Sequence, residues 1–126
     1  MSTFKSFTDL EQSKKLSEIL PIEAANMFWR YNHNIHTYDN IPKILETNNW
    51  DDADNKNIPC WSLAALLEYL RNINSTVYIP MLYVHDNKWM LQFVERGHGN
   101  VAEMECDNPV DVCYEMILKL HEQKLL

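Results

Sequence analysis

Cys60 stands in the setting of this sequence that most favours covalent chemistry. It precedes Trp61 at the expected start of a helix, and a helix N-terminus lowers the pKa of a cysteine thiol. His85 or His98, on the strands and turns expected after that helix, could accept the thiol proton, and Asn100 could orient the imidazole. These residue types allow a cysteine hydrolase that uses Cys60 and one of the two histidines.

This order of cysteine, helix and sheet histidine resembles that of papain-like cysteine hydrolases. Two features of that family are missing: no glutamine stands at the usual distance upstream to form an oxyanion hole, and no glycine-rich segment approaches Cys60. The competing interpretation is a buried structural cysteine, which a motif of this size does not exclude. We prefer that interpretation, lean against an enzyme and assign no catalytic residue.

His33 and His36, with Asp39 three residues further on, are a second candidate site, because together they could supply ligands to a metal ion. A zinc site needs three or four ligands in a tetrahedral array, and a fourth is not evident in the sequence. Two solvated loop histidines are the simpler interpretation. We therefore expect neither a bound metal nor another cofactor.

Aromatic and acidic residues around a long polar segment, residues 32–57, are candidates for contact with a partner. Most aromatic side chains of so small a chain must lie in the core, and those that cannot fit there mark an interface or a pocket. The cluster Asp51, Asp52 and Asp54, together with Glu95, Glu103 and Glu105, could form a face that mimics nucleic acid or occludes a basic site. The interaction candidates are Phe28, Trp29, Trp50, Asp51 and Asp52.

The composition limits the function classes. The 126 residues carry 11 Lys and Arg against 18 Asp and Glu, a net charge of −7, with no basic run beyond Lys14-Lys15. Direct binding of DNA or RNA is therefore not expected, whereas an acidic protein suits a basic partner surface. Only two glycines are present, Gly97 and Gly99, which excludes a glycine-rich phosphate loop.

The sequence also predicts a cytoplasmic protein without a membrane partner. It has no run of about 18 apolar residues that could span a bilayer, and its N-terminal segment lacks the apolar core of a signal peptide. Cys60, Cys106 and Cys113 are odd in number and widely spaced in apolar contexts, so we expect reduced core residues and not a disulfide framework.

Apolar spacing and residues that suit helix ends predict three helices. Thr8 and Glu11 fit the capping box of the first, and Asn57 or Ser62 could cap the second, whose leucines recur at the spacing of one helix face. Asp107 or Asn108 caps the third, with proline in its first turn. The predicted helices cover about 9–20, 59–71 and 108–123.

A three-stranded antiparallel meander is predicted over about 77–106, with Asp86-Asn87 as its first turn. In its middle strand, alternation places Trp89, Leu91 and Phe93 on one face and Met90, Gln92 and Val94 on the other. Pro80 indicates that the first strand lies at an edge or contains a bulge. The aromatic residues of 24–31 favour a further strand, although Ala24, Ala25 and Met27 would equally allow a helix. Residues 32–57 are expected to be an irregular stretch with a short helix at about 41–46.

The combination of WSLAALLEYL, a hairpin with an inward tryptophan and DNPVDVCYEMILKLHEQ resembles a pattern that recurs in small bacterial and phage-borne proteins of no known function. It covers roughly residues 57–126. The resemblance implies an α+β fold with helices on one side of an antiparallel sheet, and it carries no catalytic residues.

From these observations we expect a single α+β domain, residues 1–126, with an antiparallel sheet of three to four strands and helices packed mainly on one face. The favoured function is that of a small accessory or interaction protein, associated with a phage or mobile element, that acts by binding a protein partner. A homodimer is also compatible with the sequence.

Overall fold

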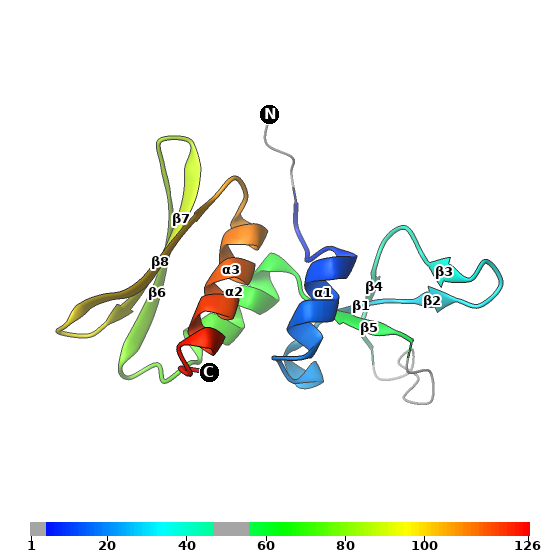
Figure 1. Ribbon diagram of the computed structural model, residues 1–126, viewed down its shortest axis with the longest axis horizontal. Helices are drawn as coiled ribbons and strands as arrows, with labels where there is room; N and C mark the ends of the chain where they lie inside the picture. The colour runs from blue at the N-terminus through cyan, green and yellow to red at the C-terminus, as the bar shows by residue number, and fades with distance from the viewer. Residues whose placement is uncertain (1–4, 47–55) are drawn as a thin grey trace. The chain divides into compact units, whose positions relative to one another are not determined.

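The structure, a computed structural model, describes residues 5–46 and 56–126. These residues form an α+β fold of three α-helices and three short antiparallel sheets (Figure 1). The chain divides into two compact units, named here the N-terminal unit (residues 7–65) and the C-terminal unit (residues 1–6 and 66–126). The boundary lies within helix α2 (Leu63–Arg71).

The predicted three-stranded meander forms the sheet of the C-terminal unit. Its strands are β6 (Tyr78–His85), β7 (Lys88–Glu95) and β8 (Gly99–Cys106), in that order. Asp86 and Asn87 turn the chain between β6 and β7 with φ values of 52° and 64°, the type I′ geometry of a two-residue hairpin. The edge position that Pro80 predicted for β6 is confirmed.

One face of this sheet lies in the core of the C-terminal unit. Leu91 and Phe93 are fully buried and pair with Met104 and Ala102 of β8, which confirms the predicted alternation. Helix α3 (Pro109–Glu122) packs against β7 and β8. Its buried side chains are Val110, Val112, Cys113, Met116, Ile117 and Leu120.

The start of α3 follows the predicted capping pattern. The Asn108 side chain accepts a hydrogen bond from the Asp111 N–H, at 2.8 Å, and Pro109 occupies the first turn, where a missing N–H costs nothing. The Asp111 carboxylate also pairs with the Lys5 ammonium, at 2.7 Å. These contacts fix where the chain leaves β8 and turns back over the sheet.

The N-terminal unit contains the other two sheets. Strand β1 (Met27–Trp29) lies between β4 (Lys43–Ile44) and β5 (Ile58–Cys60), and β2 (Tyr31–Asn32) pairs with β3 (Thr37–Tyr38). Helix α1 (Leu10–Ser17), followed by the 3₁₀ helix η1 (Ile22–Ala24), packs against β5. We expected the helices mainly on one face of a single sheet, but α1 packs against this second sheet.

The start of the central helix differs from the prediction. Residues 58–60 are extended because β5 pairs with β1, with Phe28 opposite Pro59 and Met27 opposite Cys60. A proline is tolerated there since β5 is an edge strand. The helix begins at Leu63, and the Ser62 hydroxyl accepts a hydrogen bond from the Ala65 N–H, at 3.2 Å.

Two further local predictions were wrong. The short helix expected at 41–46 is replaced by strand β4, which pairs with β1. The capping box of α1 is formed by Asp9 and Gln12, not by Thr8 and Glu11. Thr8 is unavailable as a cap because its hydroxyl is buried in a hydrogen-bonded cluster described below.

Candidate functional site

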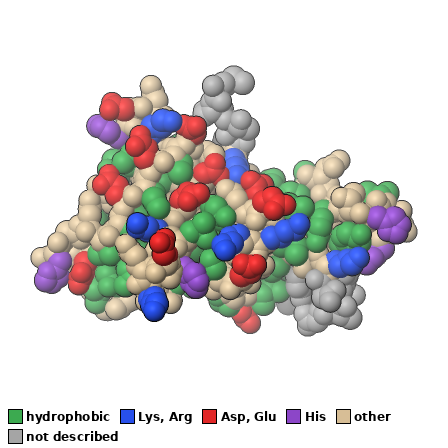
Figure 2. Space-filling view, viewed as in Figure 1, with side chains coloured by type: hydrophobic (Ala, Val, Ile, Leu, Met, Phe, Trp, Pro, Cys, Tyr) green, Lys and Arg blue, Asp and Glu red, His purple; other side chains and the backbone are tan. Residues whose placement is uncertain are grey.

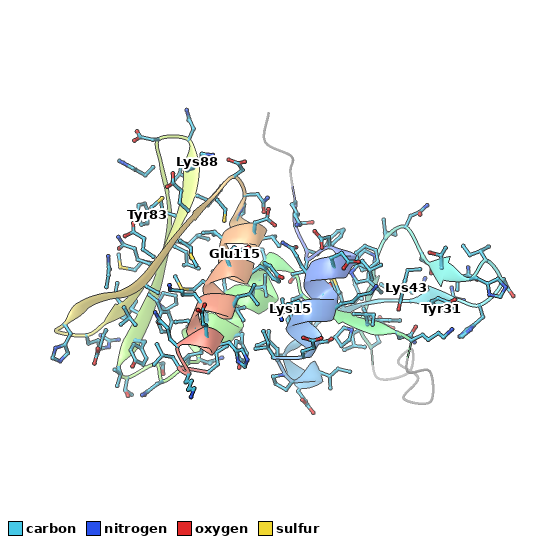
Figure 3. All side chains as sticks on the ribbon, viewed as in Figure 1. Lys15, Tyr31, Lys43, Tyr83, Lys88 and Glu115 are labelled. Atoms are coloured by element: carbon cyan, nitrogen blue, oxygen red, sulfur yellow. The ribbon has the colours of Figure 1, made fainter. Side chains whose placement is uncertain are left out.

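The candidate site is the face of the meander opposite α3, named here the outer face. Side chains alternate between the two faces of a strand, so the residues that neighbour the buried Leu91 and Phe93 along β7 point away from α3. Figure 3 shows Tyr83 on the side of the sheet away from α3, the helix that carries Glu115. The outer face consists of Ile79, Met81, Tyr83, Met90, Gln92, Val94, Glu103 and Glu105.

Apolar side chains occupy the β6 and β7 part of the outer face. Met81 is 48% exposed and Tyr83 is 36% exposed, both on β6. Their cross-strand neighbours are Gln92 and Met90, and Ile79 lies opposite Val94. Methionine is a flexible side chain that adapts to different partners, and tyrosine offers a large apolar ring with a polar tip. The band is thus well suited to contact with another protein.

Acidic side chains border this apolar band along β8. Glu103 and Glu105 are exposed and lie opposite Gln92 and Met90. Neither glutamate forms an ion pair within the described part of the chain. Figure 2 shows several acidic side chains over the part of the C-terminal unit that carries β8 and the start of α3. The outer face therefore combines an apolar band with a negative border.

Lys88, at the tip of the β6–β7 hairpin, is held by a carboxylate. Its ammonium donates a hydrogen bond to Asp107, which together with their charge attraction raises the pKa of Lys88, and Glu105 adds to the effect. This lysine therefore does little to offset the charge of the β8 border.

The structure does not supply the setting that a Cys60 nucleophile needs. Cys60 ends strand β5 instead of starting a helix, and it is fully buried. Burial raises the pKa of the Cys60 thiol, although hydrogen bonds from Thr8 and Ser13 oppose this effect. The premise of a helix N-terminus that lowers the thiol pKa is wrong, and the structural interpretation of Cys60 is the one these observations favour.

The histidines considered as its base lie at exposed turns of the C-terminal unit. His85 ends β6 and pairs with the Asp86 carboxylate at 3.3 Å, whereas His98 lies in the turn between β7 and β8. These turns are at opposite ends of β7, so His85 lies far from Asn100, the second residue of β8. Of the two histidines, only His98 lies close to Asn100, and it does so because the two residues are close in sequence.

Cys60 belongs instead to a buried polar cluster that joins α1 to β5 and β1. The Thr8 hydroxyl lies 2.8 Å from the Ser13 hydroxyl and 3.5 Å from the Cys60 sulfur, and it accepts a hydrogen bond from the Trp61 N–H at 3.2 Å. The Trp29 indole N–H donates to Ser13 at 3.1 Å. Each member has a partner, so the cluster fixes positions without leaving a free reactive group.

Labelling with iodoacetamide at pH 7.5 should leave Cys60 almost unmodified in the native protein. Only the thiolate reacts with iodoacetamide, and an unperturbed thiol is roughly a few per cent thiolate at this pH. The raised pKa keeps the thiolate fraction of Cys60 below that level, and burial blocks access of the reagent. Half-buried Cys106 serves as the internal reference, and we expect it to react first. Peptide mass spectrometry measures both sites. Rapid modification of Cys60 that precedes Cys106 would restore the hydrolase hypothesis.

The histidine pair of the β2–β3 hairpin is not arranged as a metal centre. His33 contacts the ring of Tyr31 edge-on, with centroids 4.9 Å apart, and His36 adopts a left-handed backbone conformation with φ of 57°. Asp39 pairs with Arg30 at 3.3 Å instead. In residues 5–46 and 56–126, no three His, Cys, Asp or Glu side chains gather in a way that could hold a metal ion.

Two of the aromatic interaction candidates, Phe28 and Trp29, are core residues. Phe28 is 1% exposed and Trp29 is 8% exposed. The indole N–H of Trp29 donates to Ser13 of α1, and its ring lies edge-on to Phe7 with centroids 6.0 Å apart. The prediction that these two side chains form an interface is therefore wrong. Trp50, Asp51 and Asp52 lie outside the described residues.

The outer face was missed because apolar residues fall on both faces of β6. Met81 and Tyr83 have the residue types of a core, and only the position of α3 shows which side is covered. The signal that could have found them is their register with Glu103 and Glu105, which places apolar and charged side chains on one surface.

Neither a family model, nor a curated protein, nor a solved structure matches this chain. Within the described residues, no helix has the length and apolar character needed to cross a membrane.

Proposed function

We propose that this chain is a non-enzymatic protein-binding module and that the outer face is its contact surface. The observation that supports this most directly is the exposure of Met81 and Tyr83 side by side with Met90, on the face of the sheet opposite the one that α3 contacts at β7 and β8. Contiguous exposed apolar side chains mark interaction sites, and methionine and tyrosine are enriched in protein interfaces.

The charge of the outer face supports a protein partner with a basic border. Glu103 and Glu105 would repel the phosphates of a nucleic acid and attract Lys or Arg side chains. The net charge of −7 adds a long-range attraction to a basic surface. We infer that the partner presents apolar side chains to Met81 and Tyr83 and basic ones to β8.

The setting that we propose for this activity is the cytoplasm, with the protein acting as an accessory factor of a phage or mobile element. The resemblance of residues 57–126 to small phage-borne proteins motivates this part of the proposal. The neighbourhood of the gene tests it, because phage structural or replication genes on both sides are expected.

The double variant Met81→Asp/Tyr83→Asp should lose its partner. Two charges in the apolar band must be desolvated on binding, and interface anchors of this kind contribute on the order of 1 to 2 kcal/mol each, so the two together should lower the affinity by roughly 30- to 900-fold. Tagged wild-type and variant chains purified from the source cells are compared by quantitative mass spectrometry, and the affinity for the recovered partner is then measured.

Ile41→Asp is the matched control, because Ile41 is 70% exposed and belongs to the N-terminal unit. It should retain the partner at the wild-type level, and circular dichroism should show that all variants are folded. Equal recovery of the same partner by wild type and double variant would refute the proposed function. So would the absence of any protein enriched over an untagged control.

A further inference from the structure

The two edge strands of the meander determine whether a partner can bind by adding a strand to the sheet. The Val77 carbonyl accepts a hydrogen bond from the Arg96 N–H at 2.7 Å, which starts the β6–β7 ladder. In an antiparallel pair, alternate residues direct their N–H and C=O groups to the same neighbour. Residues 79, 81, 83 and 85 therefore face β7, and residues 78, 80, 82 and 84 face the edge.

Two of the four edge positions of β6 have no N–H to offer. Pro80 has none, and the Tyr78 N–H is bonded to the Asn74 carbonyl at 3.0 Å. An added strand would therefore lose half of the donors that it needs, and the ring of Pro80 would stand in its path. Proline is one of the devices by which edge strands avoid pairing with other chains.

The β8 edge is interrupted as well. Phe93 pairs with Ala102 but Val94 pairs with Asn100, so Val101 is an extra residue without an opposite partner. A bulge of this kind bends and twists the strand and disturbs the ladder that a further strand would continue. Both edges thus disfavour strand addition, and the outer face is the surface left for binding.

The dimensions of the outer face match one helix. Strands of eight residues are about 26 Å long, and three strands place the outer two about 10 Å apart, close to the diameter of a helix. The structure contains an example on its opposite face: α3, of 14 residues and about 21 Å, packs there against β7 and β8. A second helix of similar length would cover the outer face in the same way.

The acidic border fits the spacing of a helix. Glu103 and Glu105 point to the same side and are two residues apart on a strand, which is about 7 Å. Basic residues at positions i and i+4 of a helix are about 6 Å apart along its axis. A helix laid along β7 with leucines over Met81, Tyr83 and Met90 could therefore pair each glutamate with one lysine.

We propose that the outer face binds a basic amphipathic helix of its protein partner. The proposal rests on the function proposed above and adds the form and charge of the bound segment. The helix presents its apolar stripe to the band on β6 and β7, and its Lys or Arg pair at i and i+4 to Glu103 and Glu105.

Three synthetic peptides of about 18 residues test this with the full chain. The first has a leucine stripe at helical spacing with a Lys pair at i and i+4, the second has the same composition arranged in strict apolar–polar alternation, and the third has Glu in place of Lys. Fluorescence anisotropy at low salt should show the first peptide binding at least tenfold more tightly than the others. In Glu103→Lys/Glu105→Lys, the preference should reverse in favour of the third peptide.

The outcomes separate this inference from the proposed function. If the alternating peptide binds as tightly as the first, and Met81→Asp/Tyr83→Asp abolishes its binding, the helix is refuted while the outer face remains the binding surface. If the Glu peptide matches the Lys peptide, the charge pairing is refuted. If the double Asp variant binds every peptide as wild type does, the outer face is not the site, and both proposals fail. Self-association that this variant abolishes, seen by sedimentation, would make a second copy the occupant.

Discussion

Replacement of Phe93 by alanine should lower the free energy of unfolding by about 3 to 5 kcal/mol, the usual cost of removing a buried aromatic ring. Phe93 is fully buried on the α3 side of the meander, and its ring stacks on Tyr78 with centroids 5.1 Å apart. Its removal leaves a cavity between the sheet and α3 that these side chains cannot fill without moving. Urea denaturation followed by circular dichroism measures the loss.

The control for Phe93→Ala is Tyr83→Ala, a comparable truncation on the opposite face of the same sheet. Tyr83 is 36% exposed, so the loss should be about 1 kcal/mol or less, limited to its cross-strand contact with Met90. Similar losses for the two variants would mean that the outer face is covered in the folded protein. That result would contradict the assignment of the two faces and remove the basis of the proposed binding surface.

Thr8→Val should cost about 2 to 4 kcal/mol, although it conserves the shape of the side chain. The hydroxyl of Thr8 accepts the Trp61 N–H and bonds to Ser13, and a buried polar group without a partner costs about 1 to 3 kcal/mol. Both groups would lose a partner in an environment that water does not reach. The free energy of unfolding in urea is again the measurement.

Thr37→Val is the control for Thr8→Val, because Thr37 is exposed on β3 of the same unit. It should change the stability by no more than about 0.5 kcal/mol. A Thr8→Val loss as small as this would show that the cluster around Cys60 contributes little. The same data test the expected single domain: Phe93→Ala and Thr8→Val should both lower the midpoint of one transition, whereas two separate transitions would refute it.

The meander could be predicted because its signals are local. Leu91 and Phe93 alternate with less buried neighbours, the Asp86-Asn87 dipeptide tolerates left-handed backbone angles, and Asn108 with Pro109 suits the start of α3. Each of these features depends on residues within a few positions of one another. The resulting α+β class, strand order and edge position of β6 were therefore predictable from the sequence.

The N-terminal unit could not be predicted because its strands pair over long separations. Met27 is paired with Ile44 on one side and with Cys60 on the other, and no local pattern shows which distant segment will supply the partner. The short apolar run at Pro59–Cys60 fits a strand or a helix equally well, and continuation into the leucines of α2 favoured the wrong choice.

The candidate site was unpredictable for a related reason. Phe28 and Trp29 precede a polar segment, which suggested exposure, but both are buried, and Trp29 contacts Phe7 and the α1 residue Ser13. Met81 and Tyr83 have the composition of a core, but they lie on the side of the sheet that α3 does not cover. Burial is set by the packing of helices on sheets, and this information is spread over the whole chain.

The type I′ turn at Asp86 and Asn87 has a consequence for the order of folding. A two-residue loop closes at almost no entropic cost, so the β6–β7 ladder can zip from the turn on the microsecond scale of isolated hairpins. β8 joins through a second short turn. The pairing of Met27 with Cys60 must instead wait for a long loop to close. The meander is therefore expected to serve as the folding nucleus, formed while the N-terminal sheet is still unpaired.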